Sequence, residues 1–420
     1  MFDRLKPSIY AFVKKNPRIR NSAMAVLGVF MKTKDLAIRV ITRAEIYGPP
    51  VGIIDYSDDF KNKAGEGKLA CVTAFKQTST PAEISRPLPV TVDKIIHWNY
   101  RQKQTVTDPA TYVMELKDCR VYDDGIVITP GNLMFGGVSQ FIEAGEYIKD
   151  LTQHPIFSKK ELPPLKKVKG TVAVLSAPSG RGYYHWMFDV LPRIQLLRDA
   201  GYDLDKIDKF LVNNYISRFH IETLNMIGIP RNKIMESQYN PHIQAEKLIV
   251  PSLVGDTGSI PKYACDFLRQ EFLPKITRNK NHSKRIYVNR GQVVHRRVTN
   301  EPQIVEVLQK YGFESVALET MSLLEQIALM ASAEVIIAPH GAGLTNIVFS
   351  EPGTKIIEFL HPGAVNVMYW TISADMGYQY YYLLSEGEAP PDFVNPYLNG
   401  NDMTINIDQL EELLALAAIN

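Results

Sequence analysis

The 420-residue chain has few cysteines, no long apolar run and almost no net charge. Its three cysteines lie far apart without a C-x-x-C pair, which argues against a zinc site or a disulfide framework and suits a reducing compartment. Because 47 basic residues oppose 45 acidic ones, the composition carries no nucleic-acid signature. It contains no internal repeat and no low-complexity tract. With 45% apolar residues, the chain is globular and long enough for two domains.

The basic residues are concentrated in residues 1–45, where ten lysines and arginines face three acidic residues. The same segment contains an apolar run, residues 23–31, which is too short to span a bilayer because a span needs about 20 residues. No A-x-A cleavage site follows, which disfavours a signal peptide. Two interpretations remain: a basic amphipathic segment on anionic lipid, or a helical extension packed on the protein body. We expect a cytoplasmic protein. If residues 1–45 bind anionic lipid, we expect it to be peripheral on the inner face of the membrane.

The most informative stretch is residues 333–349, Ala-Glu-Val-Ile-Ile-Ala-Pro-His-Gly-Ala-Gly-Leu-Thr-Asn-Ile-Val-Phe. An apolar, β-branched run ends at Pro339 and His340, a glycine turn (341–343) follows, and helical spacing resumes. In an α/β domain this order places small residues at the carboxyl end of a buried strand, where phosphate groups bind. Glycine lets the backbone approach phosphate oxygens. The dinucleotide fingerprint is incomplete because Asn346 replaces its third glycine, and a tight turn without a ligand is the alternative.

The strand after this turn is also informative. A turn at Pro352-Gly353 precedes a short strand, residues 355–359, that ends near Glu358. An acidic residue there is well placed for ribose hydroxyls, although a solvated carboxylate is the alternative. His340 can donate a hydrogen bond to a phosphate or sugar oxygen.

A second stretch combines a strand with a cluster of arginines. The strand, residues 286–289, runs into a loop that carries Arg290, Arg296 and Arg297, and a helix starts near Glu301. Guanidinium groups bind oxyanions bidentately and keep their charge, so this loop suits a diphosphate. A solvated basic loop is the alternative. The loop lies just upstream of the glycine turn, which favours a shared crevice.

In a third stretch, residues 180–199, His185, Asp189 and Arg193 follow one another at intervals of four. In a helix these three residues share a face, although Pro192 predicts a kink. One interpretation is an aromatic-rich core helix in which these polar residues have a structural role. The other is that His185 acts as a general base, because a neighbouring carboxylate orients the imidazole ring and raises its basicity.

The pair Asp203-Leu-Asp205 has the D-x-D spacing with which some transferases hold a metal-bound diphosphate. Here the pair lies in a polar turn after a helix and not at the end of an apolar strand. We therefore expect no metal at this position.

The remaining pattern predicts an α/β protein. Residues 46–110 favour short strands and loops, and residues 112–134 predict a hairpin that turns at Asp124-Gly125. From residue 169 onward, strands alternate with helices, which argues for a parallel sheet. Residues 251–259 are the expected domain boundary. Four regions are predicted: a basic segment (1–45), an acceptor-side domain (46–255), a nucleotide-sugar-binding domain (256–390), and a tail with a helix that packs back on the first domain (391–420).

Three motifs together resemble glycosyltransferase family 61: Tyr-Tyr-His-Trp-(x)2-Asp-(x)2-Pro-Arg, then Arg-(x)2-Asn-Glu, then Pro-His-Gly-Ala-Gly-Leu-Thr-Asn. The resemblance covers roughly residues 110–385. The family contains plant cell-wall xylosyl- and arabinosyltransferases, animal O-linked N-acetylglucosaminyltransferases and bacterial proteins of surface polysaccharide synthesis. The resemblance implies a GT-B architecture, in which two Rossmann-like domains face each other across a cleft. It also implies a nucleotide-sugar donor, inversion at the anomeric carbon, and neither a cofactor nor an obligatory metal.

The resemblance also implies roles for individual residues. Where relatives often carry Asn before the Tyr-Tyr pair, this chain has Gly182. Arg297 is assigned as a diphosphate clamp, and its neighbour Arg296 is the alternative. The implied catalytic residues are His185 and Asp189; the acceptor-side residues are Tyr184 and Arg193; the donor-binding residues are Arg290, Arg297, His340, Gly341, Ala342, Gly343, Leu344, Thr345 and Glu358.

The expected function is inverting transfer of a sugar from a nucleotide sugar, in the first instance a UDP-sugar. The expected acceptor is a hydroxyl of a glycan or lipid-linked glycan in surface or capsular polysaccharide synthesis. The alternative is a non-catalytic relative that binds a glycan or nucleotide as a partner in polysaccharide assembly. The presence of His185, Asp189, Arg290 and the glycine turn favours the enzyme.

Overall fold

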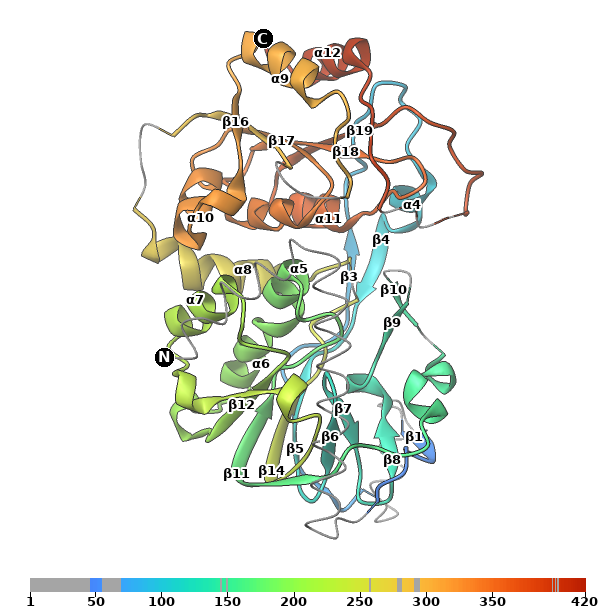
Figure 1. The fold of residues 1–420 in the computed structure, drawn as a ribbon, viewed down its shortest axis with the longest axis vertical. Coiled ribbons are helices and arrows are strands. Elements are labelled where there is room, and N and C mark those ends of the chain that lie inside the picture. The colour runs from blue at the N-terminus through green and yellow to red at the C-terminus, as the bar shows by residue number, and fades with distance from the viewer. Residues whose placement is uncertain are drawn as a thin grey trace, which may run out of the picture. The chain divides into compact units, whose positions relative to one another are not determined.

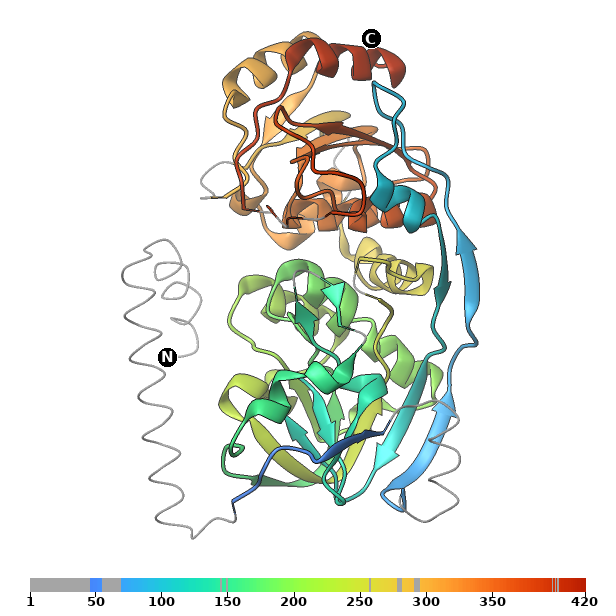
Figure 2. The same cartoon turned by 90° about the vertical axis from the view of Figure 1, so that its right-hand side faces the viewer.

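The structure is a computed structural model that describes residues 46–54, 69–143, 146–148, 150–256, 258–277, 282–290, 295–394, 396, 398 and 400–420. The basic segment, residues 1–45, lies outside the described residues. The chain divides into two compact units, each with strands and helices (Figures 1 and 2). The first unit comprises Met1–Thr80 and Ala110–Leu253, and the second comprises Pro81–Pro109 and Val254–Asn420.

A ten-stranded mixed sheet forms the first unit, in the order β1-β8-β7-β6-β14-β11-β12-β13, with β5 paired to β14 and β2 to β5. The pairs β14–β11, β11–β12 and β12–β13 are parallel, whereas β5 and β6 are antiparallel to β14. The expected parallel sheet is therefore present only in part. The strands are β1 (Gly52–Ile54), β2 (Val72–Gln77), β5 (Tyr112–Leu116), β6 (Arg120–Tyr122), β7 (Ile126–Ile128), β8 (Leu133–Phe135), β11 (Lys166–Val174), β12 (Lys209–Val212), β13 (Ile234–Glu236) and β14 (His242–Pro251).

Other elements of the first unit are a small hairpin and three short helices. The hairpin consists of β9 (Ile142–Glu143) and β10 (Glu146–Tyr147). The helices are α5 (Tyr183–His185), α6 (Arg193–Asp199) and α7 (Arg218–Ile227).

The turn between β6 and β7 is anchored to the ends of other strands. Gly125 has φ +108°, and a Cβ at this residue would lie 2.5 Å from the carbonyl oxygen of Ser176, just after β11. Ser237, just after β13, donates a hydrogen bond through Oγ to Oδ1 of Asp124 at 2.8 Å. A glycine is therefore required here, both for the left-handed backbone and for the close approach.

The second unit has a five-stranded sheet in which every pair is parallel. Its order is β16-β15-β17-β18-β19, so the first strand in the chain lies between the second and the third. Open sheets wound in this order bind ligands outside the carboxyl ends of the first and third strands, where the winding reverses. The strands are β15 (Arg285–Val288), β16 (Glu314–Val316), β17 (Val335–Pro339), β18 (Lys355–Leu360) and β19 (Gln379–Leu384); the helices are α8 (Lys262–Phe272), α9 (Glu301–Lys310), α10 (Leu323–Met330), α11 (Met368–Asp375) and α12 (Ile407–Leu416).

Residues 81–109 belong to the second unit, although the sequence assigned them to the first domain. They form a hairpin, β3 (Ala82–Ser85) with β4 (Thr105–Asp108), and helix α4 (Trp98–Gln102). Arg86 forms a two-pronged ion pair with Asp375, both distances being 2.8 Å, and this buried pair ties the hairpin to α11. The sequence of this segment lacks a regular apolar period, so no pattern indicated that the chain enters the second unit here and then returns to the first.

Helix α12 also packs in the second unit, which corrects the expectation that it packs on the first domain. It lies beside α9 (Figures 1 and 2). Leu410, Leu413 and Leu414 join a core cluster that contains Ile304 and Leu308 of α9. The apolar face predicted for this helix is real, but its partner is α9 because the tail crosses the unit beside Val298, which bridges to Met403.

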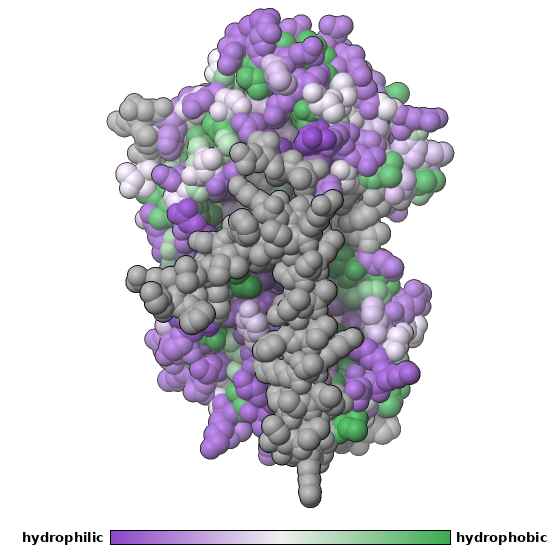
Figure 3. Space-filling view, viewed as in Figure 1, coloured by the Kyte–Doolittle hydropathy of each residue, from purple (hydrophilic) through white to green (hydrophobic). Residues whose placement is uncertain are grey.

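The surface of one face and the length of the helices can be compared with what a membrane span needs. On the coloured part of the face shown in Figure 3, hydrophilic residues predominate and apolar residues are scattered. Among the described residues, every helix is too short or too polar to cross a bilayer.

Candidate functional site

A pocket of about 150 Å³ lies where the winding of the second sheet reverses. Residues that follow β15 and residues that follow β17 line opposite parts of it, so the arginine loop and the glycine turn do share a hollow. Its lining consists of Val288, Asn289, Arg290, Leu318, Glu319, Ala338, Pro339, Gly341, Ala342, Gly343 and Leu344.

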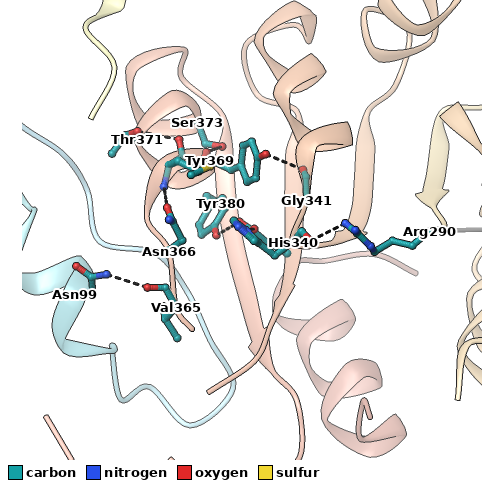
Figure 4. Close-up of polar contacts among 12 residues, drawn as sticks. Asn99, Arg290, His340, Gly341, Val365, Asn366, Tyr369, Thr371, Ser373 and Tyr380 are labelled. Atoms are coloured by element: carbon teal, nitrogen blue, oxygen red, sulfur yellow. Dashed lines mark hydrogen bonds and ion pairs between the residues drawn. The ribbon is translucent and has the colours of Figure 1, made fainter. Parts of the chain in front are cut away.

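Arg290 is in direct contact with the glycine turn. Its Nη1 donates a hydrogen bond to the main-chain oxygen of His340 at 2.9 Å (Figure 4). A Cβ built on Gly341 would collide with the same Nη1, and the next nearest atoms are also from the Arg290 guanidinium. The φ of Gly341 is 167°, which any residue adopts, so a side chain here is opposed only by the position of the Arg290 guanidinium, which would have to move.

Tyr369 of α11 holds the turn from the other side (Figure 4). Its hydroxyl donates to the main-chain oxygen of Gly341 at 2.7 Å. The segment that follows is a 3₁₀ helix, Ala342–Phe349, where the sequence predicted helical spacing. The first N–H groups of a helix have no acceptor within the helix, so those at the start of this element are available to a ligand.

His340 is oriented by a buried carboxylate. Its Nδ1 lies 2.5 Å from Oε1 of Glu358, and the Tyr380 hydroxyl donates to Oε2 at 2.5 Å. Burial, and then the charge of Glu358, raise the pKa of Tyr380 well above its usual value, so this hydroxyl stays protonated. Glu358 has no exposed surface, which corrects the expectation that it contacts ribose. It acts instead through the ring of His340, as a carboxylate that fixes an imidazole.

The two adjacent arginines differ in their surroundings. Arg297 pairs with Asp402 at 2.6 Å, 62% of its side chain is exposed, and it does not line the pocket. By contrast, the charge of Arg296 acts on both Arg290 and Tyr369. Burial, followed by the repulsion from Arg296, lowers the pKa of Arg290 to about 10.

These two guanidinium groups lack the carboxylate partners that Arg86 and Arg297 have. Among the described residues, no carboxylate lies within ion-pair distance of Arg290 or Arg296, and the Nε of each is buried without a hydrogen-bond partner. The charges of Glu319 and Glu301 act on Arg290 from beyond ion-pair distance, so the unused donors of the two arginines are suited to an anion. Glu319 lines the same pocket and is an acidic residue that sequence reasoning missed.

Leu344 and Thr345, the last two residues predicted to contact the donor in the turn, differ in their position relative to the pocket. Leu344 lines the pocket. Thr345 is fully buried beside Tyr369 and therefore supports the turn from behind, which corrects its assignment as a donor contact.

The first unit contains a second imidazole–carboxylate pair. Nδ1 of His185 lies 2.7 Å from Oδ2 of Asp189. His185 ends α5, and a π-helical turn, Trp186–Val190, carries Asp189; such turns are frequent at functional sites. The imidazole is 23% exposed whereas the carboxylate is only 2% exposed. The ring therefore reaches solvent while its orienting group stays buried.

The loop before α5 is fixed by Asn213, which follows β12. The Asn213 side chain donates to the main-chain oxygen of Ala177 at 2.8 Å and accepts from its N–H at 3.1 Å. A side chain at Gly180 would collide with the same amide. The approach to His185 is therefore rigid.

Arg193 and Tyr184 lie in the core, which corrects their assignment to the acceptor side. Arg193 is 1% exposed and donates to the main-chain oxygen of Ser176 at 2.7 Å. Arg193 begins α6 directly after the π-helical turn, and its guanidinium is used by the main chain at the end of β11. Tyr184 is 5% exposed and packs against Phe188.

The pair Asp203 and Asp205 forms a turn. Asp203 accepts the N–H of Asp205 at 3.0 Å and caps a short 3₁₀ helix, Leu204–Lys206. In the described ranges, no group of three or more histidine, cysteine, aspartate or glutamate residues could hold a metal ion.

Together the fold and the site define an α/β protein with a pocket, lined by Arg290 and the glycine turn, at a sheet switch point. Residues 183–357 match the family model described as Glycosyltransferase 61, and this match supports membership of that family. The matched range includes His185, Asp189, Arg290 and the glycine turn. No curated protein matches the chain.

Proposed function

We propose that the chain is an inverting glycosyltransferase that takes a sugar from a nucleotide sugar, in the first instance a UDP-sugar. The observation that carries the proposal is Arg290, which contacts the glycine turn without a carboxylate in ion-pair distance among the described residues, together with the nearby charge of Arg296. A nucleoside diphosphate supplies the missing negative charge. The match to glycosyltransferase family 61 supports this class of donor.

On the donor side, the pocket stabilises the leaving group. As the bond to the anomeric carbon breaks, negative charge grows on the nucleoside diphosphate. The main-chain oxygen of His340 holds Arg290, and Tyr369 holds the main chain of Gly341, so the arginine and the N–H groups of the turn are already in place. Preorganised donors of this kind reduce the barrier because they need no reorientation during the reaction. The guanidinium groups supply the positive charge, so the proposal includes no obligatory metal.

On the acceptor side, His185 takes the proton of the attacking hydroxyl. Asp189 accepts the other ring N–H and keeps the free nitrogen of the imidazole toward solvent. The acceptor oxygen then attacks the anomeric carbon opposite the departing diphosphate, which inverts the configuration. A GT-B arrangement, in which the first unit carries the acceptor and the second the donor, is part of this proposal.

The cellular role follows from the same assignment. The acceptor is a glycan or lipid-linked glycan in surface or capsular polysaccharide synthesis, and residues 1–45 bring the enzyme to the inner face of the membrane. Their ten basic residues support attraction to anionic lipid.

A ligand screen followed by a turnover assay tests the function. Thermal unfolding is measured with UDP, GDP and CMP, since a ligand at about 100 times its Kd adds about 2.7 kcal/mol of stability. Release of nucleoside diphosphate from a panel of nucleotide sugars then tests catalysis. Stabilisation without turnover on any donor would indicate the non-catalytic alternative, and the absence of any nucleotide effect would contradict both.

A further inference from the structure

The first unit has a separate pocket of about 280 Å³ that the roles above do not use. Its wall is formed by the β6–β7 turn, by residues around the β9 strand and the following 3₁₀ helices, and by Pro178 and Ser179 of the loop that leads to His185. Its polar residues include Asp123, Asp124, Gln140, His154, Lys159 and Ser179, and apolar residues such as Phe141 complete the wall. Its volume is close to the lower limit of ligand pockets, about 300 Å³, and suits one small unit.

The two carboxylates are held in place from behind. Oδ1 of Asp124 accepts a hydrogen bond from Ser237 at 2.8 Å and from Arg181 at 3.2 Å. Arg181 also lies 3.9 Å from Asp123, whose side chain is 50% exposed. Burial raises the pKa of Asp123, as does the charge of Asp124, whereas Arg181 and Lys159 lower it. The pocket thus presents fixed hydrogen-bond acceptors with part of their surface open.

A buried imidazole adds an unused donor. Nδ1 of His154 accepts the N–H of Ile156 at 3.0 Å, and burial lowers the pKa of His154 to about 4, so the ring is neutral with its proton on Nε2. His154 is 5% exposed, and among the described residues its Nε2 has no hydrogen-bond partner. Phe141 lies edge-on to this ring at 4.9 Å. A buried donor without an acceptor is unusual, and a ligand oxygen would satisfy it.

We propose that this pocket is the subsite for one sugar unit of the acceptor glycan. The hydroxyl groups of a sugar can donate hydrogen bonds to Asp123 and Asp124 and accept them from Lys159 and His154. The C–H faces of the sugar can pack against the apolar wall. Because two carboxylates line the pocket, a phosphate or nucleotide is disfavoured.

The position of the pocket fits the acceptor. Ser179 lines it, and the N–H of Gly182 donates to the oxygen of Ser179 at 2.9 Å, immediately before the helix that carries His185. The assignment to the acceptor, as distinct from sugar binding itself, depends on the proposed function.

Saturation-transfer NMR of the full-length protein tests the subsite. The probes are methyl glycosides of glucose, galactose, mannose, xylose, arabinose and N-acetylglucosamine. The test variants are Asp123→Asn, in which asparagine tolerates the left-handed φ of +48°, and Lys159→Ala. Lys160→Ala is the matched control, because Lys160 is exposed and does not line the pocket. UDP affinity and thermal unfolding are measured for each protein.

We expect at least one glycoside to bind the wild type. Its affinity should fall about tenfold or more in each test variant, as when one hydrogen bond to a charged group is removed. The control should match the wild type, and UDP affinity should be the same in all four proteins. Absence of binding by every glycoside, or equal binding in the test variants, would overturn the subsite while UDP binding preserves the proposed function. Glycoside binding without any nucleotide binding would support the sugar pocket and contradict the proposed function.

Discussion

The guanidinium group of Arg290 occupies the space into which a side chain at Gly341 would project. The observed position of the arginine that follows β15 therefore depends on the glycine that follows β17, although 50 residues separate Arg290 from His340, its hydrogen-bond partner. The small residue at 341 admits a cation to the turn, and the cation in turn fixes the main chain that faces the ligand.

Replacing Gly341 by alanine should displace Arg290 and weaken binding of UDP about tenfold or more, which corresponds to 1.4 kcal/mol. In an Arg290→Ala background the same change should have little further effect, because the three atoms nearest to the added Cβ all belong to Arg290. Calorimetric titration of the wild type, both single variants and the double variant measures the coupling. Additive losses would show that Gly341 acts independently of Arg290.

Arg290→Ala should reduce turnover at saturating donor by about 10²–10³, the usual effect of removing one preorganised donor. We expect this loss to be at least as large as that of His185→Ala. Steady-state rates of sugar transfer, with saturation verified for each variant, measure the comparison. Normal transfer by the Arg290→Ala protein would rule out the clamp role.

His185→Ala should lower the rate of transfer by about 10²–10⁴, the range for general-base catalysis, and leave UDP affinity unchanged. Asp189→Asn should also lower the rate, since an amide cannot orient and charge-stabilise the ring as the carboxylate does. The pH profile of transfer distinguishes a base from a structural residue, because only the loss of a base should change the shape of that profile in the alanine variant. An unchanged pH profile in that variant would exclude His185 as the base.

Acidification should destabilise the first unit. Burial lowers the pKa of His154 and His242 to about 4 and that of His220 to about 3, below the value of about 6.5 in an unfolded chain. The unfolded state therefore binds more protons below pH 6.5, so stability is complete above that pH and falls as the pH drops toward 4. The expected loss at pH 5 is on the order of 1–2 kcal/mol per histidine.

Thermal unfolding at pH 7.5 and pH 5 checks this expectation. His220→Gln is the control, because the fully buried imidazole is removed and the pH-dependent difference should shrink. An unfolding temperature independent of pH across this interval would contradict it.

The sequence predicted the parts of the site that lie next to each other in the chain. The glycine turn, the strand before it, and the spacing of His185 and Asp189 are local patterns, and the structure has them. It did not predict contacts made by residues distant in the chain. Tyr369 and Tyr380 come from a core helix and a buried strand, and no local pattern distinguishes them from ordinary apolar packing.

Register errors explain the remaining differences. An ideal helix predicted Arg193 on the face of His185, but a π-helical turn, Trp186–Val190, lies between them and the guanidinium of Arg193 is used by the main chain in the core. Arg296 and Arg297 are adjacent, and only the position of Asp402 in the tail decides which of them faces away. A local sequence pattern around Arg297 cannot predict that a residue of the tail, more than 100 positions later in the chain, will pair with it.

The most direct test of the diphosphate site is calorimetric titration of UDP into the wild type and the Arg290→Ala, Arg296→Ala and Arg297→Ala proteins. The proposal predicts binding by the wild type and by Arg297→Ala, whose arginine pairs with Asp402 on the surface. It predicts a loss of about tenfold or more for the other two, consistent with removal of a hydrogen bond to a charged group. Equal affinity for UDP in the Arg290→Ala and wild-type proteins would contradict the proposal.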